Sequence, residues 1–217
     1  YKPFSRNHEK LMVMDSRSAE LTKYAANCML ATKISFINEM ANLAEHLGAD
    51  IEMVRQGIGA DSRIGYHFIY AGCGFGGSCF PKDIQAMQRI AQDIDYQPLL
   101  LNAVATVNQR QKQRVFERIL EHYGGALAGK TFALWGMSFK PNTDDMREAP
   151  SRALLERLWA AGAKVQAFDP KATQAARKLY GSRPDLIFAG IKEEALEGAD
   201  ALVILTDQKG LYTADPR

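Results

Sequence analysis

Cysteine is scarce in this sequence: among 217 residues there are three, Cys28, Cys73 and Cys79, and their spacing matches neither a disulfide framework nor a zinc finger. No apolar run approaches the roughly 20 residues of a membrane-spanning helix, and the first residues lack the charged-then-apolar pattern of a signal peptide. Neither sign of charge dominates, because 27 basic residues face 25 acidic ones. Without a basic stripe, a nucleic-acid partner has no support. We expect a cytoplasmic protein that binds neither nucleic acid nor membranes.

Several catalytic and metal-binding patterns are absent as well. The four histidines, at positions 8, 46, 67 and 122, have no metal-ligand spacing, so no metal site is expected. The chain has neither a Walker A sequence nor the G-x-S-x-G of a serine hydrolase. Its composition is that of a globular protein, with 47% hydrophobic and 24% charged residues, and suits one large domain or two small ones.

The first half of the chain predicts helices almost throughout. Ser16 and Ser18 are possible N-caps of a long amphipathic helix that ends near Gly48. Asp50 can cap a short second helix, and Pro81 fits the first turn of a third, where its missing N–H costs nothing. The expected helices span residues 18–48, 51–57, 80–95 and 99–123.

From Lys130 the pattern changes to alternating strands and helices, which predicts a parallel, doubly wound sheet. The expected strands span residues 131–136, 164–169, 186–189 and 201–206, with helices over 149–161 and 172–180 and a short one near Glu193. We therefore expect an α/β protein. Its all-helical central domain would cover residues 18–127, and a Rossmann-like parallel-sheet domain would cover residues 128–217.

A glycine-rich loop in the helical half is the best candidate for a reactive site. Residues 57–79 hold seven glycines, and the loop ends on Cys79, directly before an expected helix. A cysteine at a helix N-terminus lies in the positive end of the helix dipole, and Lys82 adds a positive charge nearby. This arrangement favours the thiolate and indicates a nucleophile.

The segment from Gly72 to Gly77 also satisfies G-x-G-x-x-G, the pattern of a dinucleotide-binding turn. We reject that interpretation, because helical patterns precede and follow the loop and the required βαβ unit is missing. The glycines are instead expected to let the backbone approach a bound molecule and to position Cys79.

Three stretches of the chain resemble one known family. GCGFGGSCFPKD, at residues 72–83, looks like the active-site signature of the UDP-glucose/GDP-mannose dehydrogenases, in particular of their UDP-glucose branch. SAELTKYAAN, at residues 18–27, and ATKISFINE, at residues 31–39, are similar to the central helix of that family. GMSFK, at residues 136–140, followed by Thr143, Asp144, Arg147 and Glu148, resembles the start of its nucleotide-sugar-binding domain.

The resemblance implies a catalytic set made of Cys79, Lys23, Asn27 and Asp83. Cys79 would be the nucleophile, Lys23 and Asn27 would polarise the substrate, and Asp83 would work with Lys23 on a water. From spacing alone, Lys23 and Asn27 share one helix face, which could equally be solvated. Asp83 by itself could simply interact favourably with the dipole at the N-terminus of its helix.

The same resemblance implies substrate and cofactor contacts. Arg63 would reach the substrate across a subunit interface, and Arg147, Lys82 and Cys79 would contact NAD. Phe68 and Tyr70 could equally be core residues, and Lys140 and Arg147 could be surface cations. The implied substrate-binding residues are Lys23, Asn27, Arg63, Phe68, Tyr70, Gly72, Phe75, Gly76, Phe139 and Lys140.

By this resemblance the intact protein would be a homodimer that oxidises UDP-glucose to UDP-glucuronate with two NAD. GDP-mannose or a UDP-N-acetylhexosamine is the alternative substrate. Family members begin with an NAD-binding domain, so the chain is expected to be a fragment in which residues 1–17 are the tail of that domain and the last domain is cut short. Alone, it would be a non-catalytic module for binding and dimerisation.

Overall fold

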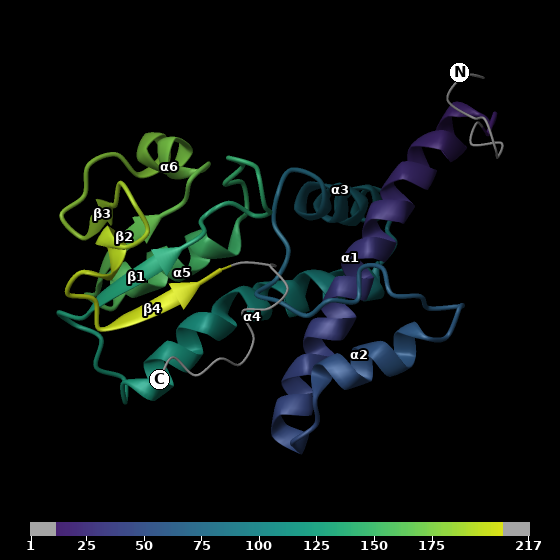
Figure 1. Cartoon of the computed structure of the whole chain (residues 1–217). Coiled ribbons are helices and arrows are strands. Elements are labelled where there is room, and N and C mark those ends of the chain that lie inside the picture. The colour runs from purple at the N-terminus through teal and green to yellow at the C-terminus, as the bar shows by residue number, and fades with distance from the viewer. Residues whose placement is uncertain (1–11, 206–217) are drawn as a thin grey trace, which may run out of the picture.

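The computed structural model describes residues 12–205, and these form a helical half and a sheet half side by side (Figure 1). The first eleven residues of the expected N-terminal tail, and residues 206–217 of the expected sheet domain, lie outside the described residues. Within residues 12–205, no helix combines the length and the apolar character needed to cross a membrane.

The long first helix, α1, spans Ser16–Leu47 and begins directly after its N-cap residue. Its N-cap is Asp15, whose Oδ1 accepts a hydrogen bond from the backbone N–H of Ser18 at 3.0 Å. The two serines expected as caps were therefore the wrong choice, because the aspartate in front of them already fills this role. Gly48 ends the helix in the left-handed conformation with φ of 68°, as expected of a C-terminal glycine.

The other helices of this half are α2 (Ile51–Gly59), α3 (Phe80–Asp93) and α4 (Leu99–His122). Asp50 caps α2 through its side chain, and Pro81 lies in the first turn of α3, as predicted. Helix α1 packs against both α3 and α4. Cys28 is buried in the small core between these three helices, so its thiol serves in packing. The other buried members of this core are Ala31, Phe75, Ile84 and Val104.

The second half is a four-stranded parallel sheet in the order β3-β2-β1-β4, which confirms the α/β class. The strands are β1 (Thr131–Trp135), β2 (Lys164–Phe168), β3 (Leu186–Phe188) and β4 (Ala201–Ile204). The connections include α5 (Pro150–Ala160), α6 (Thr173–Tyr180) and the 3₁₀ turn η2 (Glu194–Leu196). The strand order reverses beside β1, and in such sheets ligands bind beyond the carboxyl ends of the strands at that point.

Helix α4 belongs to both halves of the molecule (Figure 1). Its residue Val104 lies in the helical core, whereas Phe116 lies in the core of the sheet and packs with strand and α5 side chains. A helix of 24 residues is about 36 Å long, so it forms a stiff connection. The division at residues 127 and 128 stays a prediction, but the sheet core already includes the last turns of α4.

Candidate active site

A chain of hydrogen bonds joins polar side chains of α1 and α3. Lys23 Nζ donates to Asn27 Oδ1 at 3.1 Å, and Asn27 Nδ2 donates to Asp83 Oδ2 at 2.5 Å. The second carboxylate oxygen, Asp83 Oδ1, accepts from Lys82 Nζ at 2.5 Å. Residues 56 positions apart in the sequence thus meet, because α1 packs against α3. The one-face placement expected for Lys23 and Asn27 is what brings both to this carboxylate.

Asp83 is almost completely buried, with 2% of its surface exposed. Burial is the largest single influence and by itself raises the pKa of this carboxyl group. The hydrogen bonds from Lys82 and Asn27, together with the charges of Lys82 and Lys23, outweigh it and lower the pKa below the ordinary value. The site therefore holds a carboxylate anion between two ammonium groups.

Cys79 is exposed at the N-terminus of α3, one helical turn before Asp83. Its carbonyl oxygen accepts the backbone N–H of Asp83 at 2.9 Å, while its side chain makes no capping hydrogen bond. The sulfur lies 3.8 Å from Ser78 Oγ. The pKa of Lys82 and that of Arg147 are raised mainly by their hydrogen bonds to Asp83 and Asp145, and Cys79 is a weaker electrostatic influence on both. Cations from both halves therefore lie near this sulfur.

The glycine loop packs against the sheet half. A Cβ atom built on Gly76 would lie 2.3 Å from the carbonyl oxygen of Glu148, and one on Gly77 would lie 2.6 Å from the Phe139 ring. The N–H of Gly77 donates to the carbonyl oxygen of Arg147 at 2.7 Å. At these two positions the space of a side chain is filled by protein, a reason for glycine different from the expected approach of a bound molecule. Gly72, by contrast, borders open space.

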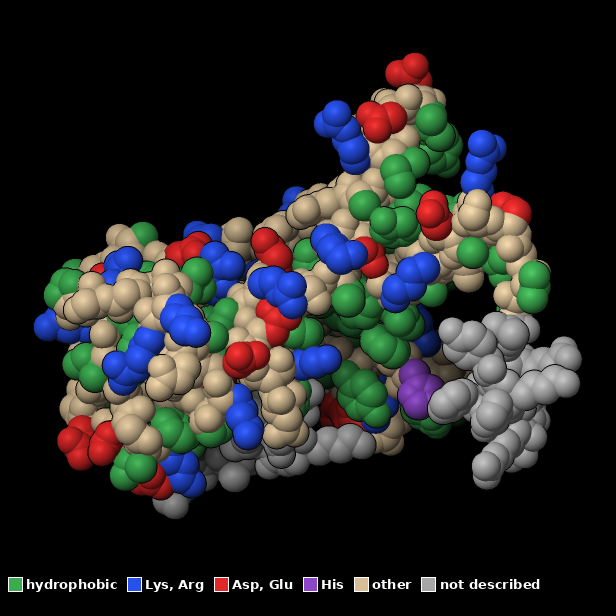
Figure 2. Space-filling model, turned by 90° about the horizontal axis from the view of Figure 1, so that it is seen from above, with side chains coloured by type: hydrophobic (Ala, Val, Ile, Leu, Met, Phe, Trp, Pro, Cys, Tyr) green, Lys and Arg blue, Asp and Glu red, His purple; other side chains and the backbone are tan. Residues whose placement is uncertain are grey.

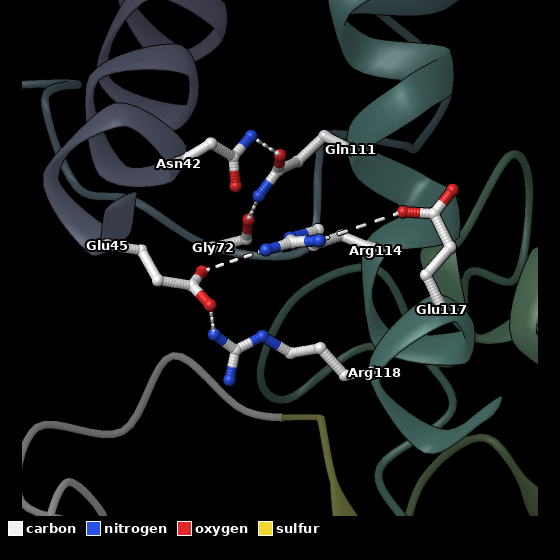
Figure 3. Close-up of polar contacts among 7 residues, drawn as sticks. All are labelled: Asn42, Glu45, Gly72, Gln111, Arg114, Glu117 and Arg118. Carbon is white, nitrogen blue, oxygen red and sulfur yellow. Dashed lines mark hydrogen bonds and ion pairs between the residues drawn. The ribbon is translucent and has the colours of Figure 1, made fainter. Parts of the chain in front are cut away.

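Buried carboxamides on α1 and α4 hold the backbone of the loop, and our reading of the sequence missed them. The N–H of Gly72 donates to Asn38 Oδ1 at 2.7 Å, and its carbonyl oxygen accepts from Gln111 Nε2 at 2.7 Å. Asn108 makes two hydrogen bonds to the backbone of Phe75. Figure 3 shows Gln111 between Gly72 and Asn42, and Asn42 Nδ2 donates to Gln111 Oε1 at 2.8 Å. A signal was available, because Asn108 and Gln111 continue the face of α4 that Val104 begins.

A ladder of ion pairs between Glu45, Arg114, Glu117 and Arg118 continues the contact of α1 with α4 toward the C-terminal end of α1 (Figure 3). Glu45 of α1 pairs with Arg114, at 3.0 Å, and with Arg118 of α4. Arg114 also approaches Glu117 at 3.9 Å. All of these side chains are at least partly exposed, so the ladder orients the helices more than it stabilises them.

In the sheet half, the predicted residues lie on the segment that follows β1. Phe139 is half-buried against Gly77, and Lys140 is exposed with its Nζ 5.3 Å from the Phe139 ring centre. Arg147 is exposed and forms two hydrogen bonds with the carboxylate of Asp145, at 2.9 and 2.6 Å. These residues therefore stand at the carboxyl end of β1, beside the glycine loop and Cys79.

Asp169, at the end of β2, fixes the start of this segment. Its carboxylate accepts the backbone N–H groups of Met137, Ser138, Lys171 and Ala172 at 2.7 to 3.1 Å. Burial, the largest influence, raises the pKa of Asp169, but the four hydrogen bonds outweigh it and lower the pKa overall. Sequence reasoning gave this residue no role.

Two predicted binding residues lie elsewhere in the helical half. Arg63 is exposed and paired with Asp61, in a turn that Lys33 of α1 contacts, about 15 Å along that helix from Lys23. Tyr70 lies under the guanidinium group of Arg55, whose carbon is 4.4 Å from the ring centre. Among the described residues, the side chain of Arg63 bonds Asp61 and none of Lys23, Asn27, Cys79 and Asp83.

Phe68 and Phe75 form an aromatic row with Phe80. Phe68 has a positive φ of 63°, and its ring meets Phe80 edge-on at 6.2 Å. Phe80 in turn meets Phe75 edge-on at 5.7 Å. Because Phe80 follows Cys79 directly, this row packs immediately beside the sulfur-bearing residue.

Comparison with known proteins identifies both halves. The UDP-glucose/GDP-mannose dehydrogenase family, central domain, matches residues 17–110, and the UDP binding domain of the same family matches residues 133–217. A UDP-glucose 6-dehydrogenase from Pseudomonas aeruginosa is 51% identical over 99% of this chain and 48% of its own length. UDP-glucose 6-dehydrogenase YwqF from Bacillus subtilis is 50% identical over 89% of this chain and 43% of its own. The chain spans about half the length of the curated relatives it matches.

Solved structures agree with this assignment. A UDP-glucose dehydrogenase from Pyrobaculum islandicum has a TM-score of 0.84 and 39% identity, over 90% of this chain and 45% of that one. A GDP-mannose dehydrogenase from Pseudomonas aeruginosa has a TM-score of 0.57 and 30% identity, over 88% of this chain and 45% of that one. The resemblance carried by residues 72–83 and the central helix is confirmed: the chain belongs to the UDP-glucose/GDP-mannose dehydrogenase family.

Proposed function

We propose that the intact protein oxidises the C6 alcohol of UDP-glucose to the carboxylate of UDP-glucuronate. The observation that carries the proposal is the hydrogen-bonded series Lys23–Asn27–Asp83, one helical turn from the exposed Cys79. A nucleophilic sulfur, an ammonium group and a carboxylate that holds its charge are what a covalent oxidation of an aldehyde requires.

Cys79 retains the substrate between the two oxidations. Its thiolate attacks C6 of the first product, an aldehyde, so a C–S bond forms and the carbonyl oxygen takes a proton. Loss of a second hydride from C6 and of the hydroxyl proton gives a thioester. Water then adds to C6 and the C–S bond breaks, which returns the thiolate and releases the acid.

Lys23, Asn27 and Asp83 stabilise the charged species of these steps. The ammonium group of Lys23 and the amide N–H of Asn27 support the oxygen that becomes negative whenever sulfur or water adds to C6. The depressed pKa of Asp83 keeps its carboxylate charged, so that it can hold Asn27 and, together with Lys23, orient the attacking water. Exposure of Lys23 and burial of Asp83 suit these tasks, since Lys23 faces incoming substrate while Asp83 holds Asn27 in place.

Substrate and cofactor would be held at the boundary of the two halves. Phe139 and Lys140, beyond β1, suit the base and diphosphate of a nucleotide sugar, with the open backbone of Gly72 on the facing loop. Phe75 and Gly76 are buried in packing contacts and would support this loop from behind. Phe68 and Tyr70 extend that face, and Arg63 would be supplied by a second copy of the chain.

The chain offers two exposed cations to a dinucleotide, Lys82 and Arg147, which both lie near Cys79. Such groups fit the diphosphate of NAD. When bound, two molecules of NAD in succession accept the two hydrides, so that one alcohol and one water give one carboxylate, two NADH and three protons.

The decisive experiment replaces Cys79 in a protein that carries this chain together with a dinucleotide-binding domain. Cys79→Ser should release no UDP-glucuronate, whereas Cys73→Ser, in the same loop, should release it with two NADH per acid. Acid release by the Cys79 variant at the wild-type rate would refute the covalent route.

A panel of UDP-glucose, GDP-mannose and UDP-N-acetylhexosamines in the same assay decides between the sugars. Calorimetry of the present chain with UDP-glucose tests whether it binds substrate alone.

We also propose that α1 forms the interface of a homodimer. Met29, Phe36 and Leu43 recur every seven residues on this helix and are 62%, 49% and 48% exposed. A row of large apolar side chains at this spacing fits a second helix. On the face of the molecule seen in Figure 2, Lys and Arg side chains are interspersed with Asp and Glu.

A further inference from the structure

We propose that Asn108 of α4 is a positioning residue for Cys79, acting through the backbone of Phe75. The inference deepens the proposed function, since it rests on Cys79 being the nucleophile. Asn108 touches neither the sulfur nor any other member of the proposed catalytic set in the described residues.

The carboxamide of Asn108 pairs with Phe75 as a neighbouring β-strand would. Its Oδ1 accepts the backbone N–H of Phe75 at 2.8 Å, and its Nδ2 donates to the carbonyl oxygen of the same residue at 3.1 Å. Asn108 is 4% and Phe75 is 7% exposed, so water does not replace these bonds. Both polar groups of one buried loop residue therefore depend on one side chain.

Phe75 transmits this anchoring to the start of α3. Its side chain packs between α1, α3 and α4, against Cys28, Ile84 and Val104. Its ring also meets Phe80 edge-on at 5.7 Å. Phe80 is the first residue of α3 and Cys79 is its N-cap, so the position of the ring decides where the sulfur stands.

The neighbouring turn of α4 aligns the opposite wall of the site. Lys112, four residues after Asn108 and 5% exposed, pairs with Glu148 at 3.1 Å. Glu148 belongs to the segment that carries Arg147 and packs on Gly76. Gly74 passes between the two α4 side chains, since a Cβ there would lie 3.0 Å from Asn108 Oδ1 and 3.1 Å from Lys112 Cγ. One face of a stiff helix thus sets both the loop before Cys79 and the segment that faces it.

The test compares Asn108→Leu with Asn102→Leu in a protein that carries this chain and a dinucleotide-binding domain. Asn102 is an exposed amide of the same helix that bonds Gln88 and not the loop, so it controls for the chemical change. Asn108→Leu should lower kcat for acid at least about tenfold with KM within about threefold, because a misplaced sulfur slows capture of the aldehyde and not its formation. Released aldehyde should raise the NADH formed per acid above two.

A purely structural role predicts a different result. Loss of folded protein lowers both oxidations together and keeps two NADH per acid. Asn108→Asp separates the two cases further. A protonated carboxyl group can both accept a hydrogen bond from Phe75 and donate one to it, so the rate of UDP-glucuronate formation relative to wild type should rise as pH is lowered from about 8 to about 5. Two NADH per acid in both Asn108 variants, with no such recovery, would overturn the proposal.

Failure of the proposed function would be recognisable separately. If the wild-type protein forms no acid from any nucleotide sugar, the positioning role is still measured by the rate at which iodoacetamide alkylates Cys79 in the present chain, followed by peptide mass. Asn108→Leu should slow this alkylation at least about threefold, because the sulfur leaves the helix N-terminus and its two cations. Equal rates in Asn108→Leu, Asn102→Leu and wild type would overturn the positioning role irrespective of substrate.

Discussion

Replacing Gly76 by alanine tests whether the two halves of the molecule are held together at the glycine loop. The added Cβ would lie 2.3 Å from the carbonyl oxygen of Glu148, 2.7 Å from its carbonyl carbon and 3.1 Å from the Cα of Ala149. All three are backbone atoms, so no side chain can rotate away. Ordinary contact begins at 3.4 Å, and the two segments must therefore separate by about 1 Å.

The expected cost follows from this displacement. Forcing extra volume into a packed contact costs about 1–3 kcal/mol. A shift of that size also breaks the adjacent hydrogen bond from Gly77 N–H to the carbonyl oxygen of Arg147, worth about 1 kcal/mol. Gly76→Ala should thus lower the free energy of unfolding by about 2–4 kcal/mol.

The measurement is equilibrium unfolding in urea, with Gly57→Ala as a matched control. Gly57 lies within α2, and a Cβ added there would meet no atom within 4 Å. The same chemical change there should raise the free energy of unfolding by about 0.5–1 kcal/mol, because alanine is the better helix former. A Gly76 variant as stable as wild type, alongside a stabilised Gly57 variant, would refute the packing argument.

Three further predictions concern other parts of the molecule. Asp169→Asn should cost about 2–3 kcal/mol at neutral pH in urea unfolding. Folding lowers the pKa of Asp169, so its contribution to the free energy of unfolding is present above the unfolded pKa of about 3.9 and is lost as pH falls through the folded pKa. Acid should therefore destabilise the wild type more than the variant. Parallel pH profiles of the two proteins would contradict this. Glu45→Gln should cost no more than about 1 kcal/mol by thermal unfolding and less at high salt, because its ion pairs with Arg114 and Arg118 are partly exposed; a larger, salt-independent loss would contradict the surface assignment. Phe36→Glu should convert a dimer to a monomer by light scattering, whereas Ile187→Glu, on the exposed edge strand β3, should not; a dimer that survives the first change places the interface elsewhere.

The predicted elements were recovered well, because their signals are local. Hydrophobic periodicity marked the long helices, and Gly48 and Pro81 marked an end and a beginning, since each acts through its own backbone. The errors were local too: Asp15, rather than either serine, caps α1. The proposed roles of Lys23, Asn27, Cys79 and Asp83 stay predictions, although the contact between Lys23 and Asn27 could be anticipated from their four-residue spacing.

Other features of the site had no local signal strong enough to reveal them. Asn108 reaches across 33 positions to Phe75, and Asn42 across 69 to Gln111. In the sequence, a buried amide cannot be distinguished from any other polar residue of a helix. Its structural role depends on which backbone group the fold brings within hydrogen-bond distance.

The amino-acid sequence by itself determined which segments are helices and strands, and it placed a thiol at the beginning of α3, because backbone preferences and periodicity act over a few residues. Tertiary structure alone decided what surrounds that thiol. Packing of α1, α3 and α4 brought Asn27 to Asp83, and α4, shared by two cores, set the glycine loop against the segment after β1. Contacts between residues far apart in the chain form only when whole helix faces and sheet edges are buried together.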